Sequence, residues 1–401
     1  MHKKILIMAG SHFQIPVIES AKRLGCTVIT CDNRPDNPGH RLADVYVNVS
    51  TTDVEGVEKV AREHGVDGIL AYASDPAAIP AAVVAERLGL PGNSAASVRK
   101  LGLKSEYRRL LREMQLPHPE FIVLERPDMD AAGVEIPFDF PVMVKPTDSS
   151  GSKGVSIARS AAELADAIDL AFTYGRNGEV VVEEHIASEC QQITGEAFIA
   201  GGDVIMLDIA DQQKDMSGLV PVGAIYPSFL KASRYLTIKD QLSRIVRSAG
   251  FRYGALNIEI RIGTDGQIYF LEVGPRSGGN FLPELMKFTV GADVATASVK
   301  VAIGVLEIGE HFNQHHSSDG TYCYYVHHTT AAGILSAIEW DDAFRAEHVI
   351  FESLFRKAGD GVSAFGNSGD LLGIAFLRFD NTDEARDFFR DPTDKVKYSL
   401  K

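Results

Sequence analysis

The stretch that decides the fold is Ala255-Leu-Asn-Ile-Glu259-Ile-Arg-Ile-Gly-Thr-Asp-Gly-Gln-Ile-Tyr-Phe-Leu-Glu272-Val-Gly-Pro-Arg276. Two mostly apolar runs flank a Thr-Asp-Gly-Gln turn, which is a strong signal for a β-hairpin. Each run carries one carboxylate, and antiparallel pairing would bring Glu259 and Glu272 together. Like charges side by side destabilise a sheet unless a cation lies between them. Two such carboxylates suit Mg²⁺, which usually shares its oxygen ligands with substrate phosphates. The alternative is two solvent-facing glutamates.

Composition and charge exclude several classes of function. A chain of 401 residues predicts two to four domains, since domains commonly have ~100–200 residues. The net charge of -14 argues against general binding to nucleic acid or to membrane surfaces. The 4 cysteines lack zinc-site spacing, so we expect reduced, buried thiols and a cytoplasmic location. We expect no signal peptide and no membrane span, because no apolar run is long enough.

The first ninety-odd residues alternate strand-like and helix-like runs, which predicts a doubly wound parallel sheet. The first turn, Gly10-Ser-His-Phe-Gln-Ile, lacks the G-x-G-x-x-G pattern, so dinucleotide binding is not favoured. Loop ends of such a sheet still face a binding crevice. His12, Asp32 and Asp75 are therefore candidate substrate contacts. The alternatives are a surface loop position for His12 and a helix cap for Asp75.

A lysine and a glycine-containing loop in the middle of the chain indicate phosphate binding. Lys145 follows a buried Val-Met-Val run, and burying a charge without a partner is costly. Small residues next in the chain would let backbone N–H groups approach a phosphate, and the serine hydroxyls and Lys153 would add donors. This loop consists of Ser149, Ser150, Gly151, Ser152, Lys153 and Gly154. The Walker pattern is absent, and a flexible turn is the alternative.

A second apolar strand, Val180-Val-Val, ends in Glu183-Glu184-His185-Ile186. A carboxylate with backbone groups at a strand end can bind an adenine amino group, and Ile186 can pack on the ring. An ordinary charged strand end is the alternative. Taken alone, Lys104 would be a solvated lysine, and Lys214 would be a lysine in a surface loop after a strand over residues 204–210.

The order of these candidate residues along the chain resembles that of the ATP-grasp superfamily. The order is Lys104, Lys145, the loop 149–154, Glu183 to Ile186, the two hairpin glutamates and Arg276. The resemblance covers nearly the whole chain. It is strongest to the branch containing biotin carboxylase, the large subunit of carbamoyl-phosphate synthetase and L-amino-acid ligases. It implies a mixed α/β fold with three domains. These are a pre-ATP-grasp domain over residues 1–93, an ATP-grasp domain over 94–305 (nucleotide-flap subdomain about 118–188) and a C-terminal lid domain over 306–401.

The resemblance also implies a role for each residue around the phosphates. Lys104 and Lys145 would contact the ATP phosphates beneath the loop 149–154, which would be a mobile flap. Glu259 and Glu272 would bind one or two Mg²⁺ ions. Arg276 would stabilise the acyl phosphate or its tetrahedral successor.

The nucleoside and substrate contacts follow in the same way. Glu183 and the backbone of Glu184 and Ile186 would hold adenine, and Lys214 would face the phosphates. The ribose contact is either Glu189 or Gln192, with Gln192 slightly favoured. The substrate would meet residues beside Arg276, with Gly278 among them.

One departure from the family pattern concerns the metal. The family usually has Glu-x-Asn-Pro-Arg, whereas this chain has Glu272-Val-Gly274-Pro-Arg276. The amide oxygen that commonly completes a second Mg²⁺ site is therefore missing. One Mg²⁺ is expected, and the second stays open. The adjacent His327 and His328 are expected to be structural, because neighbouring strand residues point to opposite faces.

The parts together imply an ATP-dependent carboxylate–amine ligase. A small carboxylate, such as an amino acid, would become an acyl phosphate, and an amine would then displace phosphate. One alternative is a carboxylase-type enzyme that phosphorylates bicarbonate. Another is a nucleotide-binding regulatory protein with a decayed site. The expected partners are small molecules, and the resemblance suggests a homodimer.

Overall fold

The N-terminal segment folds around a parallel four-stranded sheet of order β3-β2-β1-β4. This computed structural model describes residues 2–126, 131–188, 192–215, 220–312 and 320–401. The strands are β1 (Lys4–Met8), β2 (Thr27–Cys31), β3 (Val45–Val47) and β4 (Gly68–Ala71). The helices between and after them are α1 (Ile15–Arg23), α2 (Val54–His64) and α3 (Asp75–Leu88). The predicted parallel doubly wound arrangement is confirmed.

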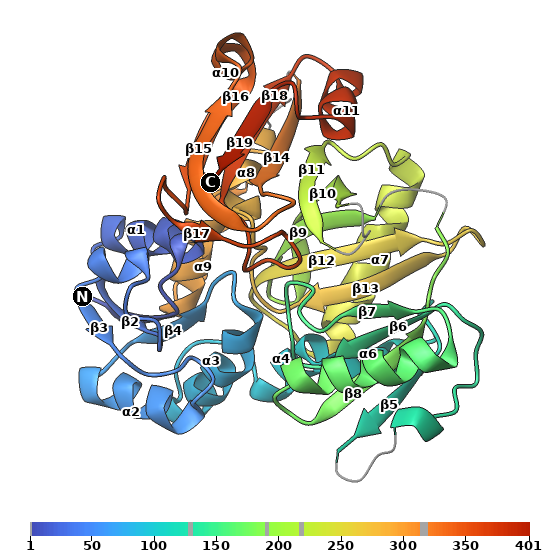
Figure 1. The fold of residues 1–401 in the computed structure, drawn as a ribbon. Helices are drawn as coiled ribbons and strands as arrows, with labels where there is room; N and C mark the ends of the chain where they lie inside the picture. Colours follow the sequence, from blue (N-terminus) through green and yellow to red (C-terminus); the bar gives the residue numbers. More distant parts are fainter. Residues whose placement is uncertain (1, 127–130, 189–191, 216–219, 313–319) are drawn as a thin grey trace.

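A helix from much later in the chain completes the core of this sheet. In α9 (Val294–Ala302), Ala295 and Val299 are buried in one cluster with Ile5 and Ile7 of β1. A Cβ on Gly68 would lie 2.0 Å from the backbone oxygen of Ala302, so the strand and the helix end approach too closely for any side chain there. The N-terminal sheet is thus anchored to the centre of the molecule (Figure 1).

A small antiparallel sheet, with strand order β5-β8-β6-β7, carries two of the predicted site residues. Its strands are β5 (Phe121–Glu125), β6 (Val142–Pro146), β7 (Ser156–Ala158) and β8 (Glu179–Glu184). Helix α6 (Ala161–Tyr174) covers one face with Leu164, Ile168 and Phe172. Glu183 on β8 pairs with Met143 on β6, two positions before Lys145. Because side chains alternate along a strand, Glu183 and Lys145 share the other face.

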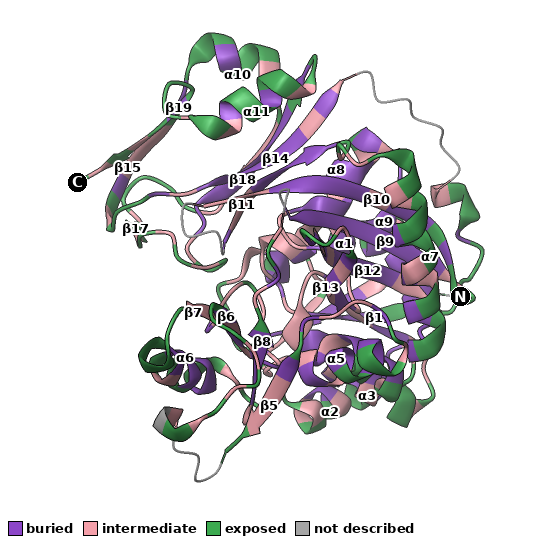
Figure 2. Cartoon of the chain, turned by 90° about the vertical axis from the view of Figure 1, so that its right-hand side faces the viewer, coloured by how far each residue is buried: buried purple, intermediate pink, exposed green. Residues whose placement is uncertain are grey.

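The largest sheet has eight strands in the order β13-β12-β9-β10-β11-β14-β18-β16. They are β9 (Ile193–Ala200), β10 (Asp203–Lys214), β11 (Pro221–Tyr226), β12 (Gly254–Ile262), β13 (Ile268–Gly274), β14 (Thr321–His327), β16 (Val349–Leu354) and β18 (Gly373–Phe379). Most of their residues are buried (Figure 2). The sheet continues past residue 305, and the three-domain division stays a prediction.

The hairpin β12–β13 is confirmed, with Glu259 directly opposite Glu272. The register shifts just after Glu259, so a bulge lies next to the carboxylate pair. Bulges re-aim side chains and are common beside active sites.

The remaining elements cover the sheets or extend the C-terminal end. They are α4 (Ala95–Gly102), α5 (Lys104–Glu113), α7 (Ala232–Ala249), α8 (Leu282–Thr289), α10 (Asp342–His348), α11 (Thr382–Arg390), β15 (Gly333–Trp340), β17 (Gly361–Val362) and β19 (Val396–Leu400). Short 3₁₀ helices occur at His12–Gln14, Pro38–Arg41, Ala131–Gly133 and Gly309–His311. Among the described residues, no helix combines the length and apolar character needed to cross a bilayer.

Several sequence expectations outside the hairpin are also resolved. Cys26, Cys31 and Cys323 are buried and unpaired, as expected, while Cys190 lies outside the described residues. His327 is buried, with its Nε2 3.2 Å from a carboxylate oxygen of Glu352. The surface-loop alternative for Lys214 is wrong, because β10 continues to this residue.

Candidate active site

The sheets and the N-terminal loops enclose one large cavity of about 1260 Å³. Every described residue predicted for the site lines it except Gly154 and Gly278. The predicted residues that line it are His12, Asp32, Asp75, Lys104, Lys145, Ser149, Ser150, Gly151, Ser152, Lys153, Glu183, Glu184, Ile186, Gln192, Lys214, Glu259, Glu272 and Arg276. Single-ligand pockets commonly measure ~300–1,000 Å³. The cavity therefore has room for a nucleotide and a second substrate.

The paired carboxylates on the hairpin carry an electrostatic signature of a cation site. Burial raises the pKa of Glu259, and the neighbouring Glu272 raises it further. Gln192 donates a hydrogen bond of 2.7 Å from Nε2 to Oε2 of Glu259, and Lys104 Nζ lies 3.6 Å from Oε2 of Glu272.

These two oxygen-rich side chains fit a Mg²⁺ ion that takes its other ligands from phosphates and water. Among the described residues, no group of three or more His, Cys, Asp or Glu side chains forms a complete protein cage for a metal. The donor set thus matches a metal that arrives with its nucleotide.

Lys145 is held by a buried ion-pair network that the sequence did not predict. Its Nζ lies 2.6 Å from Oε2 of Glu183. Arg108 on α5 is fully buried, and its Nε lies 2.8 Å from the other oxygen of Glu183. Burial alone would raise the pKa of Glu183, but the charges of Arg108 and Lys145 outweigh it and lower the pKa to about 2. Both carboxylate oxygens are engaged, so the predicted adenine contact would compete with these ion pairs.

A sequence signal for Arg108 did exist. It lies four residues after Lys104 and three before Leu111, which places it on the inward face of an amphipathic helix. Arg108 Nη2 also donates to the backbone oxygen of Leu271 at 2.8 Å, so it links the small sheet to the metal hairpin.

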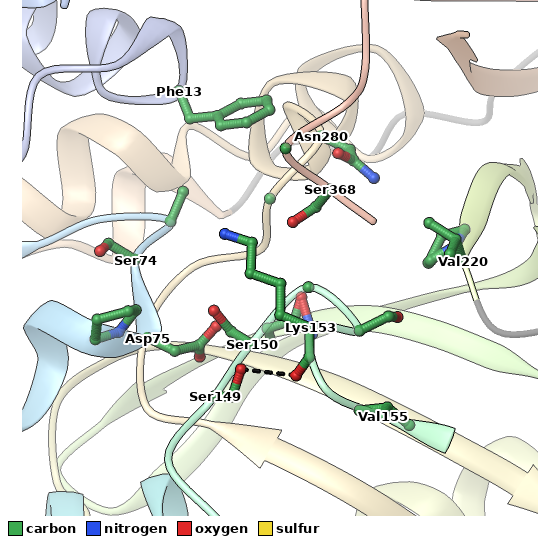
Figure 3. Close-up of a pocket in the computed structure, with 18 of the residues that line it drawn as sticks. Phe13, Ser74, Asp75, Ser149, Ser150, Lys153, Val155, Val220, Asn280 and Ser368 are labelled. Atoms are coloured by element: carbon green, nitrogen blue, oxygen red, sulfur yellow. Dashed lines mark hydrogen bonds between the residues drawn. The ribbon is translucent and has the colours of Figure 1, made fainter. Parts of the chain in front are cut away.

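The loop 149–154 is folded over one side of the cavity. Ser149 Oγ donates to the backbone oxygen of Lys153 at 2.9 Å (Figure 3). Lys104 Nζ donates to the backbone oxygen of Ser149 at 2.8 Å. Gly151 has a φ of 64° and its backbone oxygen accepts a hydrogen bond from the N–H of Ser368 at 3.3 Å. A Cβ at Gly151 would lie 1.9 Å from Ser368 Oγ. The loop therefore touches the C-terminal part of the chain.

The two glycines that do not line the cavity have packing roles instead. A Cβ on Gly154 would lie 2.8 Å from Tyr174 Cβ, so Gly154 lets the base of the loop pack on α6. The N–H of Gly278 donates to the buried carboxylate of Glu196 at 2.7 Å.

The predicted adenine end is built around Arg261, which the sequence did not single out. Arg261 Nη1 donates to the backbone oxygen of Ile186 at 3.0 Å, and its Nη2 donates to Oε1 of Gln192 at 3.3 Å. Glu189, the other candidate for the ribose contact, lies outside the described residues. Burial lowers the pKa of Lys214 to about 8, although the nearby Glu259 opposes this shift.

Asp75 and Arg276 form a two-pronged ion pair between the start of α3 and the end of the hairpin. The Nε–Oδ1 and Nη2–Oδ2 distances are both 2.6 Å. Burial would raise the pKa of Asp75, but the Arg276 charge outweighs burial and lowers it. A Cβ on Gly274 would lie 3.2 Å from Asp75 Oδ1. Glycine at this position therefore leaves room for the pair.

Two buried glutamates, Glu196 and Glu284, lie behind this ion pair, and the sequence did not predict that they lie there together. Tyr72 OH donates to Oε1 of Glu284 at 2.7 Å, and burial raises the pKa of Glu284 to about 7. Burial also raises the pKa of Glu196. Both glutamates lie outside the cavity lining, so they support the floor of the site.

Two family models match the chain. One, described as D-ala D-ala ligase C-terminus, matches residues 110–279, and the other, described as ATP-grasp N-terminal domain, matches residues 18–92. A formate-dependent phosphoribosylglycinamide formyltransferase from Burkholderia pseudomallei is 29% identical over 292 residues, covering 68% of this chain and 69% of that protein.

Solved structures share the fold along the whole chain. An L-amino acid ligase from Bacillus licheniformis has a TM-score of 0.84 and 22% identity, and covers 100% of this chain and 99% of that one. The biotin carboxylase domain of a 2-oxoglutarate carboxylase from Hydrogenobacter thermophilus, solved with MgADP and bicarbonate, has a TM-score of 0.76 and 17% identity, covering 100% and 91%.

Proposed function

Because this chain belongs to the ATP-grasp superfamily, we propose that it activates a small carboxylate with ATP and joins it to an amine. The carboxylate, an amino acid or a related metabolite, becomes an acyl phosphate, and ADP and phosphate are released. The observation that carries this proposal is the carboxylate pair Glu259–Glu272 in one cavity with Lys104 and Lys145. A homodimer stays a prediction.

The phosphate end of the cavity supplies opposite charge in fixed positions. Mg²⁺, when bound at Glu259 and Glu272, would neutralise charge on the transferring phosphate. Lys104 and Lys145 approach the same region from α5 and β6, and their carboxylate and carbonyl partners hold them in place before ATP binds. Phosphoryl transfer depends mainly on such positioning and electrostatic stabilisation.

The nucleoside contacts are proposed on the same cavity wall. Ile186 would pack on the adenine ring beside the backbone of Glu184, and Glu183 would reach the amino group only by sharing its ion-paired oxygens. Gln192 would reach the ribose. Lys214 adds a further cation near the phosphates.

The loop 149–154 would close over the reacting phosphate. Its small residues place backbone N–H groups near the phosphates, and closure excludes water, which would otherwise hydrolyse an acyl phosphate. Arg276 then stabilises the negative oxygen that develops when the amine attacks the acyl carbon. Asp75 acts as a positioning residue, because its two oxygens fix the plane of the Arg276 guanidinium.

The test is phosphate release from MgATP across a panel of amino acids, paired amines and bicarbonate. We expect release that requires a carboxylate and an amine together, with a new amide detected by mass spectrometry. Release that depends on bicarbonate alone would overturn the ligase proposal in favour of carboxylase chemistry. Tight ATP binding without release for any substrate would instead indicate a regulatory nucleotide-binding protein.

A further inference from the structure

Three cationic side chains from three separate segments line the cavity without a carboxylate partner. Arg34 follows β2, Lys153 lies in the loop 149–154, and Arg356 follows β16. Within the described parts of the chain, no ion pair is formed by any of the three. The chain as a whole carries a net charge of -14, so an unneutralised basic group is unexpected.

Arg34 and Lys153 lie close enough to influence each other, and Arg356 lines the same cavity beside His12. Burial lowers the pKa of Lys153, and Arg34 lowers it further. Burial also lowers the pKa of His12, with Arg356 as the next cause, and the His12 ring stacks on Phe355 at a centroid distance of 4.2 Å. The basic group therefore spans the N-terminal loops, the loop 149–154 and the segment after β16.

The position of Lys153 separates this group from the metal hairpin. Its side chain extends from the loop away from Ser149 and Ser150, toward the part of the cavity where Ser74 and Phe13 lie (Figure 3). These residues belong to the N-terminal segment, whereas Lys104 and Lys145 lie near the carboxylate pair.

Three acids lie near these cations, and two of them accept hydrogen bonds within their own loops. Asp32 accepts hydrogen bonds from Asn37 Nδ2 at 2.7 Å and from the N–H of Arg34 at 3.2 Å. Asp370 accepts from the N–H groups of Gly366 and Asn367. Asp36 also lines this wall, and it too makes no ion pair with the three cations among the described residues. Among the described residues, none of these carboxylates lies within 4.0 Å of a charged nitrogen of Arg34, Lys153 or Arg356, so the direct contacts of the three cations are open to a ligand.

We propose that the second substrate of this enzyme carries an anionic group of its own, a phosphate or a further carboxylate, which binds between Arg34, Lys153 and Arg356. This inference rests on the proposed ligase function and names the class of molecule that the ligase joins. An anion there relieves the repulsion between Arg34 and Lys153, and charge-assisted hydrogen bonds from two arginines give directional recognition.

The experiment measures equilibrium binding of matched probe pairs by calorimetry, with Mg²⁺ and a non-hydrolysable ATP analogue present. One pair is O-phosphoserine and serine, and the other is aspartate and asparagine. We expect the anionic member of at least one pair to bind about tenfold more tightly, the effect of one hydrogen bond to a charged group. A phosphate preference appears in the first pair and a carboxylate preference in the second.

Substitutions of the two arginines test where on the protein the anionic group binds. Arg34→Gln and Arg356→Gln should each weaken binding of the preferred anionic probe about tenfold and leave its neutral partner within about twofold. Arg390→Gln, with a side chain 77% exposed on α11, is the matched control and should change neither. Binding of the ATP analogue by each variant reports whether it is folded.

Two results would overturn the proposal. The first is equal binding of the anionic and neutral members of both pairs. The second is an anion preference that stays intact in both Arg34→Gln and Arg356→Gln. Neither readout requires turnover, so failure of the ligase reaction and failure of anion recognition are distinguishable.

Discussion

Two groups of cationic side chains lie in or directly behind the cavity wall, and they differ in what holds them. Lys104, Lys145 and Arg108 lie within 4.0 Å of Glu272 or Glu183, and they are largely buried. In contrast, Arg34, Lys153 and Arg356 have no ion-pair partner among the described residues. The first group has its geometry fixed before substrate arrives, which suits a step that depends on positioning. The second group has unsatisfied charge, which suits recognition.

The largest expected effect comes from substituting Glu183, the carboxylate that holds Lys145 and Arg108 of the first group. Glu183→Gln leaves the fully buried Arg108 without a counter-charge and turns an amide toward Lys145. We expect the free energy of unfolding to fall by about 3–5 kcal/mol, as for other broken buried ion pairs. Denaturant unfolding of both proteins measures this change. A loss below about 1 kcal/mol would mean that the network does not hold these side chains.

The next largest effect concerns the metal hairpin. Glu272→Gln should reduce turnover by about 100-fold or more, because even partners behind metal ligands commonly contribute 10–100-fold. The free energy of unfolding should change by less than about 1 kcal/mol, because Glu259 loses a like-charged neighbour while Lys104 loses its carboxylate partner. Glu347→Gln, with a side chain 75% exposed on α10, is the control for both measurements. Normal turnover in the Glu272 variant would remove the metal assignment.

A smaller effect should appear as pH dependence of ATP binding. Burial lowers the pKa of Lys214 to about 8, so this side chain loses its charge as pH rises through that value. ATP binds the charged form, so affinity should be constant well below about pH 8 and fall above it, by at most about tenfold per pH unit for one proton. Titrating a fluorescent ATP analogue across this range tests the slope.

The control for that titration is Lys214→Arg, which stays charged throughout and should give a nearly flat profile. Equal slopes in the two proteins would assign the pH dependence to another group.

The smallest effect on stability is expected in the second group, which consists of Arg34, Lys153 and Arg356. Lys153→Gln removes a charge that has no ion-pair partner within the described ranges, so the free energy of unfolding should change by less than about 0.5 kcal/mol. Denaturant unfolding of Lys153→Gln and Glu183→Gln in one series compares the stability contributions of the two groups directly. A loss above about 1 kcal/mol would mean that Lys153 has a structural partner, and the contrast would fail.

The sequence predicted what depends on local pattern. The turn at residues 264–267 and the alternation on either side were enough to place Glu259 opposite Glu272. The alternating strands and helices of the first ninety residues were enough for the parallel sheet. Both follow from residues near one another in the chain.

The sequence could not show which charged side chains form ion pairs with one another. Asp75 and Arg276 are 201 positions apart, and each was predicted to bind substrate rather than its partner. Glu183 looked like an adenine contact because nothing local shows that Arg108, 75 positions earlier, lies beneath it. Pairings of this kind depend on how the sheets pack.

The space at Gly274 has a consequence for how this site can change during evolution. The Cβ of any other residue there, including the asparagine usual in the family, would lie 3.2 Å from Asp75 Oδ1, so the ion pair with Arg276 would have to shift slightly to accept it. The residue at position 274 and the geometry of the Asp75–Arg276 pair therefore constrain each other, although the acidic and the basic partner lie far apart in the chain.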